Sequence, residues 1–464
     1  MILVGARSNM RMARDEGASD KGVAAMGTAA MGAGATVQSW AERWRGVTAD
    51  LGRAQARVDA VVDEIDGRMI RIGRRWLADF ASGNYIGFDV SSEIVEAVPD
   101  YLQRWGTHTG FSRQLGSPRL YEEIEARLTA LLRAEDVLVL PGTPNIHASV
   151  IPRLVGSGMI LLDRGAHASI EQGCAVAVSH GATVVKFDHD DIGQLAQLLS
   201  THRRQTAMIC LDGIHAMTGS APDLGSLAML ARAHDTLLYI DDTHGFGIIG
   251  ERAPDEQCRY GNRGNSIVRH FGESYDNIAL TGAFSNAYSS LLSFVALPTR
   301  LKLMLMSSAR SALHSSSSPV ASLARVLEGL GVNDRRGDQL RLELYRTTRR
   351  VLGALRDLGM PMPAATDAAY PIIDVPLRDV RLLNQVGRFL FEQGIYAILA
   401  TPPVVPCHAA AIRIHLTSAN TPQQVSHLID SLRALSDRGW LATPHDPAAS
   451  AEAVQRGLVE LVAC

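Results

Sequence analysis

The sequence predicts an α/β fold with a large, mostly parallel sheet and a smaller C-terminal α+β domain. Short apolar runs alternate with helical patterns through the middle of the chain. Strands that alternate with helices need crossover connections, which place helices on both faces of a parallel sheet. The expected strands are residues 137–140, 159–162, 183–187, 207–211, 237–240, 278–281 and 293–297. Polar residues directly follow several of them, and ligands of open α/β sheets bind at that edge.

Size and composition are those of a soluble globular enzyme. The chain has 464 residues, of which 46% are hydrophobic and 20% charged, and its net charge is −3. This balance, without a basic block, argues against nucleic acid or an anionic membrane surface as a partner. Five cysteines without CxxC spacing indicate reduced thiols and no metal site. The reduced thiols indicate a cytoplasmic protein. No apolar run reaches about 18 residues, so we expect no membrane span.

The N-terminal part lacks strand signals. Residues 1–36, rich in Gly, Ala, Met and Ser, are expected to be a disordered leader. Residues 37 to about 81 show an amphipathic helical pattern that includes Val62 and Ile65, which predicts an arm packed on the body or on a partner subunit. Ser92 then precedes a predicted helix over residues 93–105.

The C-terminal part predicts a second, smaller lobe. We expect one helix within residues 303–330, entered through 315–318, and a long helix over 339–358. Strands are expected at 370–376, 396–399 and 412–416, and Thr421-Pro422 is typical of the N-cap and first turn of a final helix. The domain boundaries that follow are a leader at 1–36, an arm with helices at 37–105, a large domain at 106–325, a small domain at 326–440 and a tail at 441–464.

The stretch LLYIDDTHGFGIIG, residues 237–250, carries the strongest chemical signal. Asp241 and Asp242 end a buried strand, and His244 follows at once. At the carboxyl edge of a parallel sheet, two acids and an imidazole indicate a site, although the acids could also simply end the strand and begin a turn.

Three further signals are weaker individually. Gly142-Thr143 lies between a strand and a helix, where free N–H groups can hold a phosphate, or where the chain simply turns. His167 follows another strand and is either a site residue or a surface histidine. Arg413 lies inside a strand, where its charge needs an ion pair or a bound carboxylate.

The order of the motifs resembles one family. The glycine loop is followed by HAS, DGIHAMTGSAPDL, YIDDTHGFGIIG, TGAFSNA, PPVVP and IRIHLTSAN. Over roughly residues 80 to 437, this resembles the α-oxoamine synthases, which are fold-type I pyridoxal 5′-phosphate (PLP) enzymes. The resemblance implies decarboxylative condensation of an amino acid with an acyl thioester, and a homodimer with its site at the subunit interface.

The resemblance also implies residue roles. Asp241 pairs with the pyridine nitrogen, His244 contacts the phenolic oxygen of the ring, and His167 stacks on the ring face. The other implied contacts are Gly142, Thr143, Ser285 and, from the partner subunit, Ser315 or Ser316 for the cofactor, with Arg413 for the substrate carboxylate and Asn84 and Ser112 in substrate-side segments.

One departure changes the expected chemistry. Where the family has a lysine that binds the cofactor covalently, this chain has Asn286, whose amide is not nucleophilic. The only lysines are Lys21, Lys186 and Lys302, none within the motifs. Ala216 and Ala283 also replace a serine and a threonine that many members have.

Three interpretations remain open. The protein could be an enzyme with altered or impaired chemistry that binds PLP non-covalently, with His167 or a water replacing the lysine as the base. It could be a non-catalytic subunit, or pseudoenzyme, that pairs with a lysine-bearing paralogue. It could also be a cofactor-free module that binds an acyl thioester.

Overall fold

The computed structural model describes residues 60–142, 145–202, 207–215, 219–253, 257–360, 369–400 and 410–442. Its central element is a seven-stranded sheet in which one strand, β10, is antiparallel to its neighbours. In spatial order the strands are β4 (Asp136–Pro141), β10 (Leu292–Leu297), β9 (Ile278–Ala283), β8 (Leu237–Asp241), β7 (Ala207–Asp212), β5 (Met159–Asp163) and β6 (Thr183–Phe187). The predicted α/β class with a mostly parallel sheet is confirmed.

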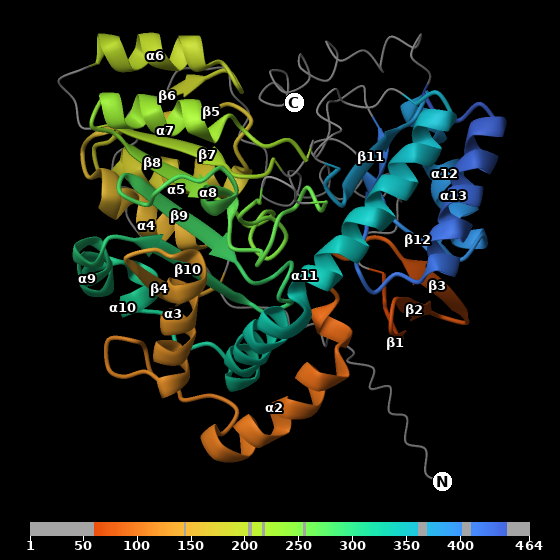
Figure 1. Cartoon of the computed structure of the whole chain (residues 1–464), viewed down its shortest axis with the longest axis horizontal. Helices are drawn as coiled ribbons and strands as arrows, with labels where there is room; N and C mark the ends of the chain where they lie inside the picture. The colour runs from red at the N-terminus through yellow and green to blue at the C-terminus, as the bar shows by residue number, and fades with distance from the viewer. Residues whose placement is uncertain are drawn as a thin grey trace, which may run out of the picture. The chain divides into compact units, whose positions relative to one another are not determined.

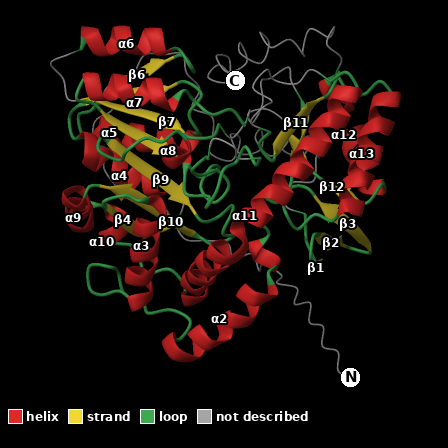
Figure 2. Ribbon diagram, viewed as in Figure 1, coloured by secondary structure: helices red, strands yellow, loops and turns green. Residues whose placement is uncertain are grey.

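Helices cover both faces of this sheet (Figure 2). Alternate residues of each strand point to opposite faces, as Val137 and Val139 join one hydrophobic cluster while Leu138 and Leu140 join the other. The cluster that contains Leu138 and Leu140 also takes side chains from α4 (Asn145–Val155), α5 (Ala168–Ser179), α9 (Thr299–Ser308) and α10 (Arg310–Leu313). The first cluster takes side chains from α2 (Ser92–Trp105), α3 (Arg119–Leu132), α6 (Ile192–Thr201), α7 (Leu224–Ala233), α8 (Ile267–His270) and α11 (Val320–Asp357).

Two smaller sheets lie toward the C-terminal end of α11 (Figure 1). One is antiparallel, in the order β11 (Ile372–Pro376), β14 (Ala411–His415) and β13 (Ile398–Ala400). The other contains β1 (Glu64–Asp66), β2 (Met69–Ile72), β3 (Arg75–Asp79) and β12 (Ile395–Tyr396), with β12 parallel to β3. The remaining helical elements are η1 (Phe88–Val90), η2 (Val380–Leu382), α12 (Leu383–Glu392) and α13 (Pro422–Asp437).

The prediction of a helix up to about residue 81 is wrong for its described part, because residues 64–79 form three strands. Gly67 and Gly73 have φ of 54° and 62°, a left-handed conformation that lets the chain turn tightly between the strands. The apolar spacing of Val62 and Ile65 was misleading, since both side chains are exposed. The leader and the first part of the expected arm lie outside the described residues.

Two C-terminal predictions also need correction. The helices expected within 303–330 and over 339–358 share one continuous helix, α11, while α9 and α10 precede it. Gly329 lies inside α11. A Cβ there would come 2.9 Å from Tyr288 and 3.2 Å from Phe88, so close packing favours glycine at this position. The strand expected at 396–399 is split between two sheets, as β12 and β13.

The end of the small lobe agrees with its sequence signal. Thr421 caps α13, and its hydroxyl and the Gln424 side chain form a reciprocal capping box. The expected tail lies mostly outside the described residues. None of the helices in the described part of the chain has the length and apolar character needed to cross a membrane.

Candidate functional site

The centre of the candidate site is a buried carboxylate at the carboxyl end of β8. Asp241 Oδ2 accepts a hydrogen bond from His147 Nε2 at 3.0 Å, and Asp241 Oδ1 accepts from the backbone N–H of Thr243 at 3.1 Å and its hydroxyl at 2.6 Å. His147 Nδ1 lies 2.8 Å from the Tyr239 hydroxyl. We call Tyr239, His147, Asp241 and Thr243 the carboxylate cluster.

This arrangement keeps Asp241 ionised. Burial raises the pKa of the carboxyl, but the charge and hydrogen bond of His147, together with the bonds from Thr243, outweigh it and lower the pKa to about 2. A carboxylate has about four acceptor positions, and the protein bonds described above occupy three. Asp241 therefore has capacity for one further N–H donor.

The next residue, Asp242, has a structural environment. Its Oδ2 accepts from the backbone N–H of Ile267 at 2.9 Å, and burial raises its pKa well above the usual range. A Cβ on Gly213 or Gly245 would approach Asp242 Oδ1 to 2.7 Å or 2.0 Å. Asp242 thus fills a space that only two glycines leave open, and the strand-ending interpretation applies to it better than a site role.

A second group of polar side chains surrounds His244. The Tyr85 hydroxyl lies 3.0 Å from His244 Nδ1, and Asn286 Nδ2 lies 3.3 Å from both His244 Nδ1 and the Thr243 carbonyl oxygen. Desolvation lowers the pKa of His244 to about 4, so the ring is neutral at pH 7. Burial raises the pKa of Tyr85, so its hydroxyl keeps its proton, and because the Asn286 amide nitrogen can only donate, His244 Nδ1 is the acceptor. The hydrogen-bond network then assigns the imidazole proton to Nε2.

Asn286, which stands at the position expected for the cofactor-binding lysine, therefore lies in the same group of residues as His244. The two lysines among the described residues form ion pairs with acidic residues outside this group. Lys186 Nζ is paired with Glu171 at 2.5 Å, and Lys302 Nζ is paired with Asp136 at 2.7 Å and Glu125 at 3.1 Å. Lys21 lies outside the described residues.

His167 is exposed at the start of α5, next to another strand end. Its Nδ1 lies 2.7 Å from the Ser169 hydroxyl, and its backbone N–H donates to Asp212 Oδ2 at 2.8 Å. Asp212 is the register neighbour of Asp241 on β7, and burial together with the charge of Asp241 raises its pKa well above the usual range. The strand ends therefore bring His167 to the same edge of the sheet as the carboxylate cluster.

Gly142 follows β4 and precedes α4. It has φ of 76°, and among the described residues no atom lies within 4 Å of the position that a Cβ would take. Its carbonyl accepts from Ser293 at 3.1 Å. The next residue, Thr143, lies outside the described residues, as do Ala216 and residues 402–406.

Arg413 has a protein partner. Its Nε and Nη2 donate to the two carboxylate oxygens of Asp374 at 2.8 and 2.9 Å, and the two residues face each other directly across β14 and β11. Of the two explanations for a charge within this strand, the structure shows the ion pair. The charge of Arg413 also helps to lower the pKa values of His244 and His415 to about 4, after the larger effect of burial.

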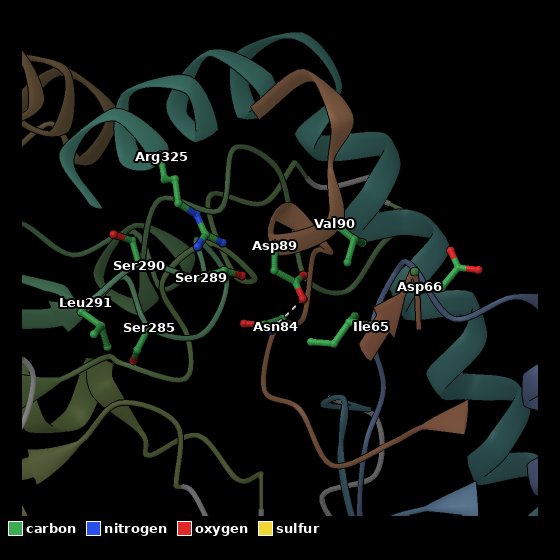
Figure 3. A pocket seen from close by; sticks show the side chains of 11 residues that line it. Ile65, Asp66, Asn84, Asp89, Val90, Ser285, Ser289, Ser290, Leu291 and Arg325 are labelled. Carbon is green, nitrogen blue, oxygen red and sulfur yellow. Dashed lines mark hydrogen bonds between the residues drawn. The ribbon is translucent and has the colours of Figure 1, made fainter. Parts of the chain in front are cut away.

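Two expected substrate or cofactor residues, Asn84 and Ser285, line a cavity of about 630 Å³ (Figure 3). Asn84 donates to Asp89 Oδ2 at 2.8 Å, Ser285 lies on the opposite wall, and Arg325 extends into the space from α11. Ser112 forms an isolated bridge with Ser316, next to Ser315. The structure therefore brings Asp241, His244 and Asn286 together but pairs Ser316 with Ser112.

Sequence reasoning missed His147, Tyr85 and Asp374. Two signals were available in the sequence. One is a histidine early in the helix after the Gly142 turn, and the other is an acidic residue in one apolar strand that can pair with an arginine in another. Neither signal names a partner without the topology.

The fold and this strand-end site define a broad class. A family model described as aminotransferase class I and II matches residues 77–432. The chain therefore belongs to the aminotransferase class I and II family.

Similar proteins narrow this assignment. The 8-amino-7-oxononanoate synthase of Pelobacter propionicus is 30% identical, with 87% of this chain and 99% of that protein covered. The serine palmitoyltransferase of Sphingobacterium spiritivorum is 28% identical, with 84% and 92% covered. A solved serine palmitoyltransferase from S. paucimobilis, a lysine-to-alanine variant with bound PLP–myriocin aldimine, shares the fold with a TM-score of 0.77 at 20% identity, with 87% and 99% covered. Within its family, the chain belongs to the α-oxoamine synthases, which confirms the resemblance inferred from the motifs.

Proposed function

We propose that this protein binds PLP without a covalent link and uses it, in altered α-oxoamine synthase chemistry, on an amine and an acyl thioester. The observation that carries the proposal is the ionised Asp241 with one acceptor position left over. A protonated pyridine nitrogen fits that position, and a ring held so acts as an electron sink when PLP is bound.

The neighbouring residues fit the rest of the cofactor. His244 carries its proton on Nε2 and can donate it in a hydrogen bond to the phenolic oxygen, and the exposed His167 is available to cover the ring face. The open space at Gly142, before the N-terminus of α4, fits a phosphate. We assign Ser285 and one of Ser315 and Ser316 to the phosphate as well, the latter from a partner subunit in a homodimer.

Asn286 is the reason that the cofactor is held non-covalently. Its amide cannot form the covalent link, and it cannot remove a proton from a substrate carbon as an amine can. His167 or a water would then move that proton, so we expect slow turnover. Among similar proteins, a lysine-to-alanine variant of serine palmitoyltransferase has been solved with a PLP–myriocin aldimine, which supports a site that keeps its ligand without that lysine.

A titration of the purified protein with PLP tests the proposal. We expect saturable binding in the 1–100 µM range, about −6 to −8 kcal/mol, which borohydride does not convert into a covalent adduct in intact-mass spectra. Asn286→Lys should gain a borohydride-fixed adduct of one cofactor per chain, while Lys186→Arg, a matched change at a distant ion pair, should behave as wild type. Failure of both wild type and Asn286→Lys to bind PLP would refute the proposal.

A second candidate is a non-catalytic subunit, which Asn286 also favours. In that case a lysine-bearing α-oxoamine synthase from the same genome should co-purify with this chain as a heterodimer. The measurement is native mass spectrometry after co-expression. A homodimer that binds PLP in the presence of that relative would favour the first candidate.

A further inference from the structure

The Arg413–Asp374 pair has a geometry that determines what else Arg413 can bind. Two parallel N–H···O bonds, at 2.8 and 2.9 Å, join one edge of the guanidinium to both oxygens of one carboxylate. This fork is the strongest arrangement that arginine forms with a carboxylate. Arg413 and Asp374 are direct cross-strand neighbours, so the rigid pairing of β14 with β11 holds the two side chains face to face.

The pair belongs to the surroundings of the candidate site, because β14 also carries His415, whose ring centroid lies 5.9 Å from that of Tyr85, the residue that contacts His244. The charge of Arg413 contributes to the low pKa values of His244, His415 and His215, each about 4, and it opposes the raised pKa of Tyr85. The Arg413 side chain is 10% exposed and that of Asp374 is 25% exposed. The guanidinium is therefore both near the site and mostly shielded from water, where charges interact more strongly than at the surface.

We propose that Asp374 occupies the hydrogen-bonding fork of Arg413, so that the site selects an amine without a carboxylate over an amino acid. This rests on the proposed function, since it concerns the amine that reaches the PLP site. A ligand carboxylate has to displace Asp374, which leaves a partly buried aspartate unpaired, or bind beside it and meet its negative charge. Either route is unfavourable, because like charges in a shielded site cost free energy. Asp374 is then the residue that determines specificity, because it occupies the Nε and Nη2 edge of Arg413 that could otherwise hold a ligand carboxylate.

Two stable PLP conjugates that differ by one carboxylate test the selectivity. They are N-(5′-phosphopyridoxyl)-L-alanine and N-(5′-phosphopyridoxyl)ethylamine, and their dissociation constants are measured by isothermal titration calorimetry on the full-length protein. We expect wild type to bind the ethylamine conjugate at least about tenfold more tightly. Asp374→Asn should reverse the preference by removing the negative charge that opposes a ligand carboxylate at Arg413, whereas Asp379→Asn, at a half-buried aspartate close by in the chain, should leave it unchanged.

A double variant guards against misfolding of the single one. Asp374→Asn with Arg413→Gln keeps a neutral, hydrogen-bonding pair, so it should keep the wild-type preference. Tighter binding of the alanine conjugate by wild type, or equal binding of both conjugates, overturns the inference and leaves the proposed function standing. If neither conjugate nor PLP itself binds to wild type, both the inference and the proposed function fail.

Discussion

The carboxylate cluster and the Arg413–Asp374 pair are two ways of burying a charge, and they leave the site with opposite properties. Asp241 is ionised but is held by donors that leave it one acceptor position, so its charge stays available. Arg413 meets a carboxylate of its own chain in a fork, so one bidentate edge of its guanidinium is already occupied. The difference indicates that the Asp241 side of the site favours a cationic partner, whereas the Arg413 side has no unmet requirement for an anion.

The largest effect should come from removing each carboxylate. Asp241→Ala takes away the partner of a 2%-exposed histidine, and we expect it to lower the free energy of unfolding by about 3–5 kcal/mol. Asp374→Ala should cost less, about 1–2 kcal/mol, because the Asp374 side chain is 25% exposed and water screens its interaction with Arg413 more than it screens the pair at Asp241. Urea unfolding followed by circular dichroism measures both. Equal losses would mean that the two regions do not differ as described.

A smaller effect should come from packing. Gly245→Ala places a Cβ 2.0 Å from Asp242 Oδ1, which cannot move freely because its carboxyl also bonds to Ile267, and we expect a loss of about 2–3 kcal/mol. Gly83→Ala meets only the end of the Asn286 side chain, at 3.3 Å, and should cost less than about 1 kcal/mol. The same unfolding assay compares the two. A Gly83 variant as unstable as the Gly245 variant would show that the Asn286 side is packed just as rigidly.

The smallest effect should appear in the pH dependence. Burial and the charge of Arg413 lower the pKa of His415 from 6.5 to about 4, so between those values the unfolded chain binds a proton that the folded chain does not. Stability therefore falls as the pH decreases from 6.5, by about 1 kcal/mol from this histidine by pH 5.5. His415→Gln should remove that share of the slope, and His180→Gln, at an exposed histidine, should not. Parallel slopes for wild type and His415→Gln would contradict the assignment.

Much of the fold followed from local patterns. Buried parallel strands are continuous apolar runs, so the strands of the large sheet and the polar residues at their ends could be predicted from the sequence. The errors came where apolar spacing was ambiguous. Val62 and Ile65 fit a helical spacing, but Ile65 lies in the short, exposed strand β1 and Val62 lies just before it.

By itself, the sequence determined the family, the strand-end position of Asp241 and His244, and the absence of a lysine from the motif at Asn286, because each depends on residues adjacent in the chain. Only the tertiary structure decided which side chains form hydrogen bonds and ion pairs with the buried charged residues. His147 reaches Asp241 across 94 positions, and Asp374 reaches Arg413 across 39. Hydrogen bonds and charges act over a few ångströms of space regardless of separation along the chain, so whether a buried charge is available or already paired depends on the folded register of strands and helices.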